Sequence, residues 1–102
     1  DNLLIIHDDI DLPLGTIKFK KNGGSGGHKG IDSIIYHLRA DNFRRLRIGI
    51  ATNEKMRPSE KYVLKPFSNK QKEEIKKTID LSYEGIQFYL NNDINQTMNN
   101  FN

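Results

Sequence analysis

The sequence predicts an α/β fold, because segments with strand patterns alternate with segments that have helical spacing. Residues 3–6 form a continuous apolar run, whereas residues 16–20 and 44–50 alternate between apolar and polar side chains. Residues 30–39 and 68–91 instead repeat apolar residues every three or four positions. A length of 102 residues, without an internal repeat or a linker, fits one domain.

The predicted strands differ in their expected burial. The run at 3–6 (Leu-Leu-Ile-Ile) predicts a strand buried on both faces, which needs neighbours at both edges. We therefore expect the chain to be part of a longer domain. In 16–20, Lys18 and Lys20 point away from the apolar face. In 44–50, one face carries Leu46, Ile48 and Ile50, and the other carries Arg45, Arg47 and Gly49.

Helical spacing predicts two helices. The first covers residues 30–39, with a stripe made of Ile31, Ile34, Ile35 and Leu38. The second begins at Ser68, which forms a capping-box pattern with Gln71, and its expected core stripe is Ile75, Ile79, Ser82, Ile86 and Leu90. Residues 91–102 predict a short helix or a disordered tail. Residues 52–61 predict an exposed, mobile loop, and residues 62–64 a short ordered segment.

Composition limits the function classes. The absence of cysteine excludes disulfides and thiolate metal sites and favours a reduced cytoplasm. No apolar run reaches membrane-spanning length, so we expect a soluble protein. The net charge is +3, but residues 1–17 carry four acids and no base, whereas residues 18–47 carry eight bases and two acids. This asymmetry suggests an anionic partner beside a carboxylate site, and an ordinary solvated surface is an equal alternative.

The glycine-rich segment 23–30 invites comparison with phosphate-binding loops. It fits neither specific nucleotide motif, because Lys29 lies between His28 and Gly30 where a Walker loop needs a Gly-Lys-Ser/Thr order, and it occupies a glycine position of the dinucleotide fingerprint. A nucleotide-binding domain is therefore disfavoured. A flexible connection into the following helix is the simpler alternative.

Acidic residues follow the first predicted strand. Strand alternation places His7, Asp9 and Asp11 on one side and Asp8 on the other, so they do not converge on one metal ion. We predict a functional role for Asp8 and a turn-forming role for Asp11. The sequence leaves three roles open for His28: general base, base-stacking residue or loop hydrogen-bond donor. His37 is expected to be structural, at a helix C-terminus.

Five segments in this order resemble one family, the bacterial peptidyl-tRNA hydrolases. They are His7 to Gly15 (His-Asp-Asp-Ile-Asp-Leu-Pro-Leu-Gly), Ile17 to Lys20, Gly26 to Ile34, Arg45 to Ile50 and Tyr62 to Ser68. The resemblance implies a single α/β domain with a twisted mixed sheet flanked by helices, which cleaves the ester between peptide and tRNA without a metal or other cofactor. It also implies that an aspartate matching Asp8 hydrogen-bonds a histidine base, and that residues matching Lys20 and Arg47 grip a tRNA phosphate. Lys18 and Arg45 are expected to add to the positive electrostatic field around that phosphate.

Two departures from the family pattern shape the prediction. The family's N-terminal half, with its catalytic histidine, has no counterpart here, so residues 1–102 are interpreted as the C-terminal portion of the domain, inactive alone. Lys29 stands where the family usually has an asparagine that holds substrate or water, and His28 matches a non-catalytic loop histidine. Both residues are expected on the substrate side. The expected partner is peptidyl-tRNA, through its acceptor stem and peptide, and the expected setting is a cytoplasmic protein, monomeric at full length. The alternative is a non-catalytic RNA-binding module of the same fold.

Overall fold

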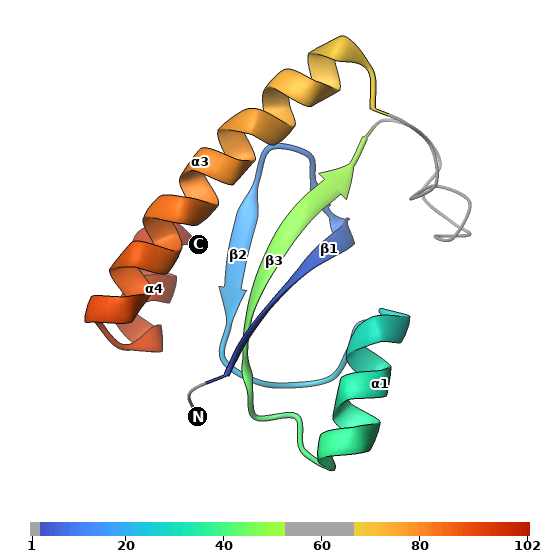
Figure 1. The fold of residues 1–102 in the computed structure, drawn as a ribbon, viewed down its shortest axis with the longest axis vertical. Helices are drawn as coiled ribbons and strands as arrows, with labels where there is room; N and C mark the ends of the chain where they lie inside the picture. The colour runs from blue at the N-terminus through green and yellow to red at the C-terminus, as the bar shows by residue number, and fades with distance from the viewer. Residues whose placement is uncertain (1–2, 53–66) are drawn as a thin grey trace.

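The computed structural model describes residues 3–52 and 67–102, which form a three-stranded mixed sheet with helices on both sides of it (Figure 1). The α/β class is therefore confirmed. In chain order the elements are β1 (Leu4–Pro13), β2 (Ile17–Lys20), α1 (Lys29–Leu38), β3 (Arg44–Ala51), α3 (Asn69–Asn91) and α4 (Ile94–Phe101). The loop predicted at 52–61, apart from Thr52, and the segment predicted at 62–64 lie outside the described residues.

The sheet has the order β1-β3-β2, so β3 is its central strand. β1 runs parallel to β3, and β2 runs antiparallel to it. Leu46 is the register partner of Ile6 on one side and of Phe19 on the other, which places these three side chains on one face. The opposite face carries the positions that alternate with them, among them His7, Asp9, Lys18, Lys20, Arg45 and Arg47.

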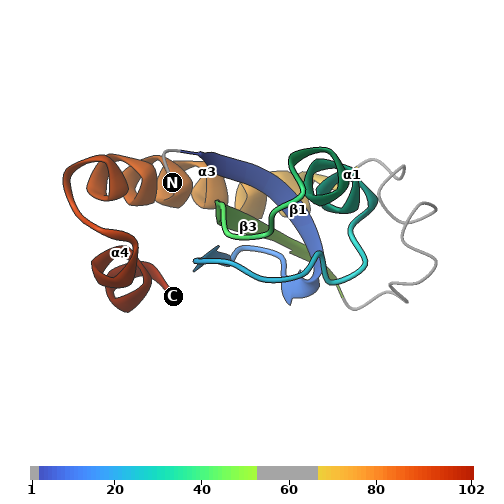
Figure 2. The same ribbon diagram turned by 90° about the horizontal axis from the view of Figure 1, so that it is seen from below.

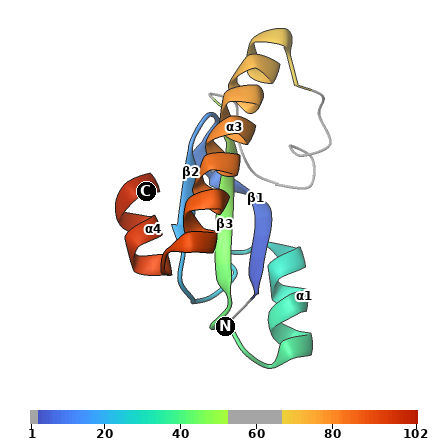
Figure 3. The same ribbon diagram turned by 60° about the vertical axis from the view of Figure 1, so that its left-hand side comes forward.

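The predicted burial of the first strand is wrong. β1 forms as a strand, but Ile6 is 51% exposed and Leu3 is 38% exposed. Within residues 3–52 and 67–102, β1 is an edge strand that pairs only with β3, and the core helices α3 and α4 lie on the β2 side of the sheet, away from β1 (Figures 1 and 3). β1 also continues to Pro13, with an irregular register between Asp9 and Pro13.

Gly49 is required by that irregular register. A Cβ atom at position 49 would lie 2.1 Å from the carbonyl oxygen of Pro13 and 2.9 Å from that of Leu12. No side chain fits there, because real Cβ atoms do not approach backbone oxygens so closely. The close approach of the β1 backbone to β3 therefore depends on glycine at this position.

The core lies between the sheet and the C-terminal helices. Ile17, Phe19, Leu46 and Ile94 form its buried centre. Figures 1 and 3 show α3 and α4 on the β2 side of the sheet and α1 on the β1 side. Figure 2 shows α4 folding back below α3. The predicted helix 30–39 and the capping box of Ser68 with Gln71 are confirmed.

The core stripe predicted for the long helix is only partly correct. The buried residues of α3 are Thr78, Ser82 and Gly85, whereas Ile79 is 59% exposed and Leu90 is 68% exposed. Small side chains face inward because the Phe19 ring lies against the helix: a Cβ atom at position 85 would be 2.8 Å from it. The fully buried positions of the helix are therefore small residues, while Leu81, Ile86 and Tyr89 pack partly buried against the core.

The helical alternative for the tail is confirmed by α4, which begins with a capping box between Asp93 and Gln96. After α4, the side-chain amide of Asn102 contacts the backbone of β2. Its Oδ1 accepts from the Phe19 N–H at 2.7 Å, and its Nδ2 donates to the Phe19 carbonyl at 2.9 Å. Asn102 thus occupies the outer edge of β2.

Candidate functional site

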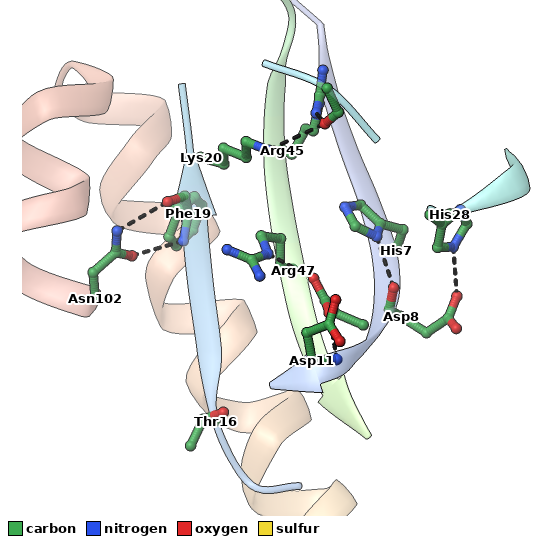
Figure 4. Close-up of polar contacts among 12 residues, drawn as sticks. His7, Asp8, Asp11, Thr16, Phe19, Lys20, His28, Arg45, Arg47 and Asn102 are labelled. Atoms are coloured by element: carbon green, nitrogen blue, oxygen red, sulfur yellow. Dashed lines mark hydrogen bonds and ion pairs between the residues drawn. The ribbon is translucent and has the colours of Figure 1, made fainter. Parts of the chain in front are cut away.

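The site is organised around His28, which joins the glycine-rich loop to α1. His28 is the N-cap of α1, and its Nδ1 accepts the Ile31 N–H at 3.1 Å. Because Nδ1 accepts, the ring proton of neutral His28 lies on Nε2. Nε2 then donates to Asp8 Oδ1 at 2.9 Å (Figure 4). Both ring nitrogens are therefore engaged, which argues against the general-base role that the sequence left open for His28.

Asp8 lies in β1, at the edge of the sheet that faces α1. Its side chain is about half exposed, at 47%. Its Oδ1 is held by His28, while Oδ2 has no hydrogen-bond partner among residues 3–52 and 67–102. A carboxylate fixed in this way can accept a second hydrogen bond and orient another donor. The placement of Asp8 opposite to its neighbours agrees with the strand alternation in the sequence.

His7 lies next to this pair. Its ring makes an edge-to-face contact with His28, with centroids 4.8 Å apart, and its Nδ1 donates to the Asp8 carbonyl at 2.7 Å. Burial lowers the pKa of His7 below its ordinary value of 6.5, and the neighbouring His28 lowers it further. The Asp8 carbonyl and the charges of Asp9 and Asp8 oppose this shift without reversing it. His7 is thus held towards its neutral form.

Arg47 and Lys20 lie on the polar face of the sheet, in β3 and β2. Arg47 Nε donates to Asp9 Oδ2 at 2.7 Å, and Lys20 Nζ donates to the Gly24 carbonyl at 3.1 Å (Figure 4). Burial lowers the pKa of Lys20, and the positive charges of Arg45 and Arg47 lower it further. Lys18 lies exposed on the same strand. The predicted basic strand face therefore exists.

The tRNA contact predicted for Arg45 does not fit the structure. Arg45 is 1% exposed, and its guanidinium is occupied by backbone carbonyls. Nη1 donates to Gly24, while Nη2 donates to Gly23 and to Asp41. Strand alternation correctly placed Arg45 on the face of Arg47. The alternation does not predict that the glycine-rich loop folds over this face and covers Arg45.

The remaining predicted residues are distributed around the site. Lys29 is the first residue of α1 and is exposed. The turn role predicted for Asp11 is wrong in detail: Asp11 lies within β1, and its N–H donates to Asp9 Oδ1 at 2.8 Å, so Asp9 supplies the local side-chain contact. His37 lies in the last turn of α1, where its Nδ1 donates to the Ser33 carbonyl at 2.8 Å.

Sequence reasoning missed the contact between His28 and Asp8. The sequence does indicate the capping role of His28, because His28 stands three residues before the first apolar residue of the helical stripe, where an N-cap is expected. Histidine is not among the usual cap residues, so the residue type does not mark this position as a cap. Nothing in the sequence placed the ring beside a carboxylate 20 residues away.

The described residues contain no cluster of three or more histidine, cysteine, aspartate or glutamate side chains arranged to hold a metal ion. Over the same residues, none of the helices combines the length and the apolar character that crossing a membrane requires.

Comparisons with known proteins extend this picture. The family model described as peptidyl-tRNA hydrolase matches residues 1–102. A peptidyl-tRNA hydrolase of Thermodesulfovibrio yellowstonii is 47% identical over 102 residues, which are 100% of this chain and 54% of that protein. One of Hydrogenobaculum is 52% identical over 83 residues, 81% of this chain and 44% of that protein. The chain therefore spans about half the length of the curated relatives it matches.

Solved structures agree with the sequence comparison. The crystal structure of peptidyl-tRNA hydrolase from Acinetobacter baumannii superposes with a TM-score of 0.80 at 35% identity, covering 94% of this chain and 48% of that one. A peptidyl-tRNA hydrolase crystallised with N-propanol gives a TM-score of 0.82 at 32% identity, with the same coverage of both chains. A family match over residues 1–102, relatives of 47–52% identity and the shared fold lead to one conclusion: the chain belongs to the peptidyl-tRNA hydrolase family.

Proposed function

We propose that this chain is the C-terminal portion of an esterase domain that cleaves the ester bond between peptide and tRNA in peptidyl-tRNA. The observation that carries the proposal is Asp8, whose carboxylate is fixed by His28 on the edge strand of a sheet that carries Lys18, Lys20 and Arg47 on its opposite face. Family membership supports the reaction class. The match to about half of each relative's length supports a chain that carries part of the domain.

Asp8 is proposed to orient the histidine that activates water. One carboxylate oxygen is held by His28, and the other has no partner among the described residues, so it can accept a hydrogen bond from a second imidazole. Such a bond fixes the tautomer of the base and stabilises the imidazolium formed when water loses its proton. The base lies outside residues 1–102 in this proposal, because both nitrogens of His28 are already engaged.

Lys20 and Arg47 are proposed to hold a tRNA phosphate, with Lys18 adding to the field. They lie on one face of two adjacent strands, and Arg47 uses only Nε for Asp9, which leaves its two terminal nitrogens without a partner among the described residues. A phosphate there would oppose the burial and the repulsion by Arg45 and Arg47 that lower the pKa of Lys20. Phosphate contacts of this kind supply affinity and register rather than sequence preference.

His28 and Lys29 are proposed to lie on the substrate side of the site, since they begin α1 next to Asp8. Lys29, in place of the asparagine expected from the family pattern, puts an exposed positive charge there. We also propose that the longer protein works as a cytoplasmic monomer. No cofactor is needed for this chemistry, because a carboxylate and a histidine base suffice to activate water.

Peptide release from peptidyl-tRNA tests the catalytic role. In the longer protein that contains residues 1–102, Asp8→Asn should lower kcat by about 10²-fold or more, since the amide cannot stabilise the imidazolium. Asp80→Asn, on the exposed face of α3, should leave kcat unchanged. Residues 1–102 alone should give no turnover, and robust release by them would contradict a base outside this segment.

RNA binding tests the basic face. Lys20→Ala and Arg47→Ala should each weaken tRNA binding and reduce the slope of log affinity against log salt by about one. Lys76→Ala, exposed on α3, serves as the matched control. Unchanged slopes for both variants would refute the phosphate role.

The second candidate, a non-catalytic RNA-binding module, is favoured by the same basic face and by Lys29. Binding alone does not separate it from the esterase, because both need phosphate contacts. Turnover by the longer protein does: binding of tRNA without peptide release would establish the module.

A further inference from the structure

The buried guanidinium of Arg45 is the least expected group in this molecule. It lies in the central strand, 1% exposed, 4.3 Å from the centre of the Phe43 ring. Nη1 donates to the Gly24 carbonyl at 2.5 Å, and Nη2 donates to the carbonyls of Gly23 and, at 3.1 Å, Asp41. Among the described residues no carboxylate forms an ion pair with it. Its charge is therefore balanced by backbone dipoles, by the Phe43 ring and by the nearby charge of Asp41.

Two of those three carbonyls, at Gly23 and Gly24, belong to the glycine-rich loop. Glycine has more backbone freedom to lose than any other residue, so a loop of this composition does not hold one conformation by itself. Arg45 fixes two consecutive carbonyls, at Gly23 and Gly24, and Lys20 donates to the second of them. The Asp41 carbonyl joins the arginine to the loop a second time, because it accepts from both Arg45 Nη2 and the Gly23 N–H.

A short series of hydrogen bonds connects this anchored segment to His28. Ser25 directly follows Gly24; its carbonyl accepts the His28 N–H at 3.2 Å, and its Oγ accepts the Gly27 N–H at 3.1 Å. The His28 ring then caps α1 and donates to Asp8. The His28 ring that contacts Asp8 is thus connected, through Ser25, to the loop carbonyls of Gly23 and Gly24 that Arg45 binds.

We infer that Arg45 is a positioning residue, which clamps the carbonyls of Gly23 and Gly24 and thereby holds His28 on the Asp8 carboxylate. It touches no substrate. Its importance for ester hydrolysis rests on the proposed function, whereas the positioning of His28 does not.

The tautomer of His28 provides the readout, since ring ¹⁵N chemical shifts distinguish protonated from unprotonated nitrogens. In the unmodified chain His28 should carry its proton on Nε2. His37 should show the opposite tautomer, because its Nδ1 donates to Ser33 within α1, and it serves as an internal control. Arg45→Met should move the His28 shifts towards those of a mixture of both tautomers and leave His37 unchanged.

Arg44→Met is the matched control, because Arg44 is the neighbouring arginine and donates to Lys21 and Asn42 but not to the loop centre. It should preserve the His28 tautomer. Two milder variants keep the test decisive if Arg45→Met does not fold. Arg45→Lys keeps the positive charge but cannot reach three carbonyls. Ser25→Ala removes the hydrogen bond from the Gly27 N–H to Ser25 Oγ, which lies outside the core. Both should shift His28 part of the way. A His28 tautomer unchanged in every folded variant, or an equal shift in Arg44→Met, would overturn the inference.

Kinetics of the longer protein separate this inference from the proposed function. Arg45→Lys should lower kcat by about tenfold or more with KM unchanged, as expected when a reacting group is displaced but substrate contacts remain. Loss of tRNA affinity with unchanged kcat would instead make Arg45 a binding residue and overturn the positioning role. Absence of turnover in the unmodified protein would refute the esterase, while the His28 shifts would still decide the role of Arg45.

Discussion

At the residue scale, His28 makes two hydrogen bonds that require the same ring tautomer. Its Nδ1 lone pair caps α1, and its Nε2–H holds Asp8. Protonation of Nδ1 would remove the acceptor that the Ile31 N–H needs, so the helix start and the carboxylate contact favour one tautomer together. The space for this arrangement is limited: a Cβ atom at position 30 would lie 3.0 Å from Cε1 of the ring.

The ion pair between Asp9 and Arg47 gives a prediction for pH-dependent stability. Burial by itself would raise the pKa of Asp9, but the Arg47 hydrogen bond, the Asp11 N–H and the Arg47 charge together lower it below 3.8. A carboxyl group with a lowered pKa in the folded state stabilises the fold above pH 3.8, and this stabilisation is lost as pH falls through the lower folded-state value. Asp9→Asn should cost about 1–3 kcal/mol at pH 7.

Chemical denaturation between pH 7 and pH 2 would measure this effect. The difference between the unmodified chain and Asp9→Asn should shrink below pH 3.8, whereas Asp80→Asn, exposed on α3, should show little difference at any pH. A destabilisation by Asp9→Asn that stays constant over this range would show that the ion pair is not its cause.

Strand alternation was enough to separate Asp8 from Asp9 and to group Arg47 with Lys20, because side chains alternate across a strand with a period of two. It could not reveal that Arg45 is covered or that His28 reaches Asp8. Both facts depend on the path of the glycine-rich loop, and that path is fixed by tertiary hydrogen bonds rather than by local sequence.

At the element scale, the close contact between β1 and β3 has a measurable consequence. Gly49→Ala would place a methyl group 2.1 Å from the Pro13 carbonyl oxygen, so the end of β1 must move away from β3. We expect a loss of about 3 kcal/mol or more in the free energy of unfolding, at the upper end for an overpacked site. Thermal or urea unfolding measures it, with Gly24→Ala as the control, because a Cβ atom at position 24 meets no atom within 4 Å. Equal stability of the two variants would contradict the steric argument.

The positions of the helices and strands could largely be predicted from the sequence. Which of their residues face the core was harder to predict. Capping residues and period-two or helical spacing located β2, α1, β3 and α3 within a few residues. The predicted inward face of α3 is right for Ser82 and wrong for Ile79 and Leu90, which hydrophobicity marks as core residues. Close packing against Phe19 instead places Gly85 on the inward face. Size complementarity with a distant aromatic ring leaves no periodic signal in the helix itself.

At the scale of the whole molecule, the charge asymmetry of the sequence becomes a spatial one. The acidic first strand and the basic second and third strands lie side by side in one sheet, so carboxylates and basic residues share a face. Arg47 meets Asp9 there, while Lys20 stands among positive neighbours. The sequence could predict the imbalance of charge but not which cations pair internally.

This electrostatic arrangement predicts a response of Lys20 to RNA. Burial and the charges of Arg45 and Arg47 lower its pKa, and a nearby phosphate would favour the charged ammonium and raise it again. Titration of the Lys20 side chain by NMR should therefore show a higher pKa with an acceptor-stem RNA than without it. The exposed Lys76 should shift less. An unchanged Lys20 titration in the saturated complex would place the phosphate elsewhere.

The contact between Asn102 and Phe19 bears on how the protein avoids self-association. An uncovered strand edge offers free N–H and C=O groups to a second chain, which is a common route to aggregation. The Asn102 amide presents one acceptor and one donor to the backbone of Phe19 and so imitates a neighbouring strand for a single residue. Asn102→Ala should expose this pair, and light scattering on heating should show earlier aggregation than for Asn100→Ala, whose side chain bonds only within α4. A side-chain amide at a helix end would then protect the sheet in the way that a further strand does in larger sheets.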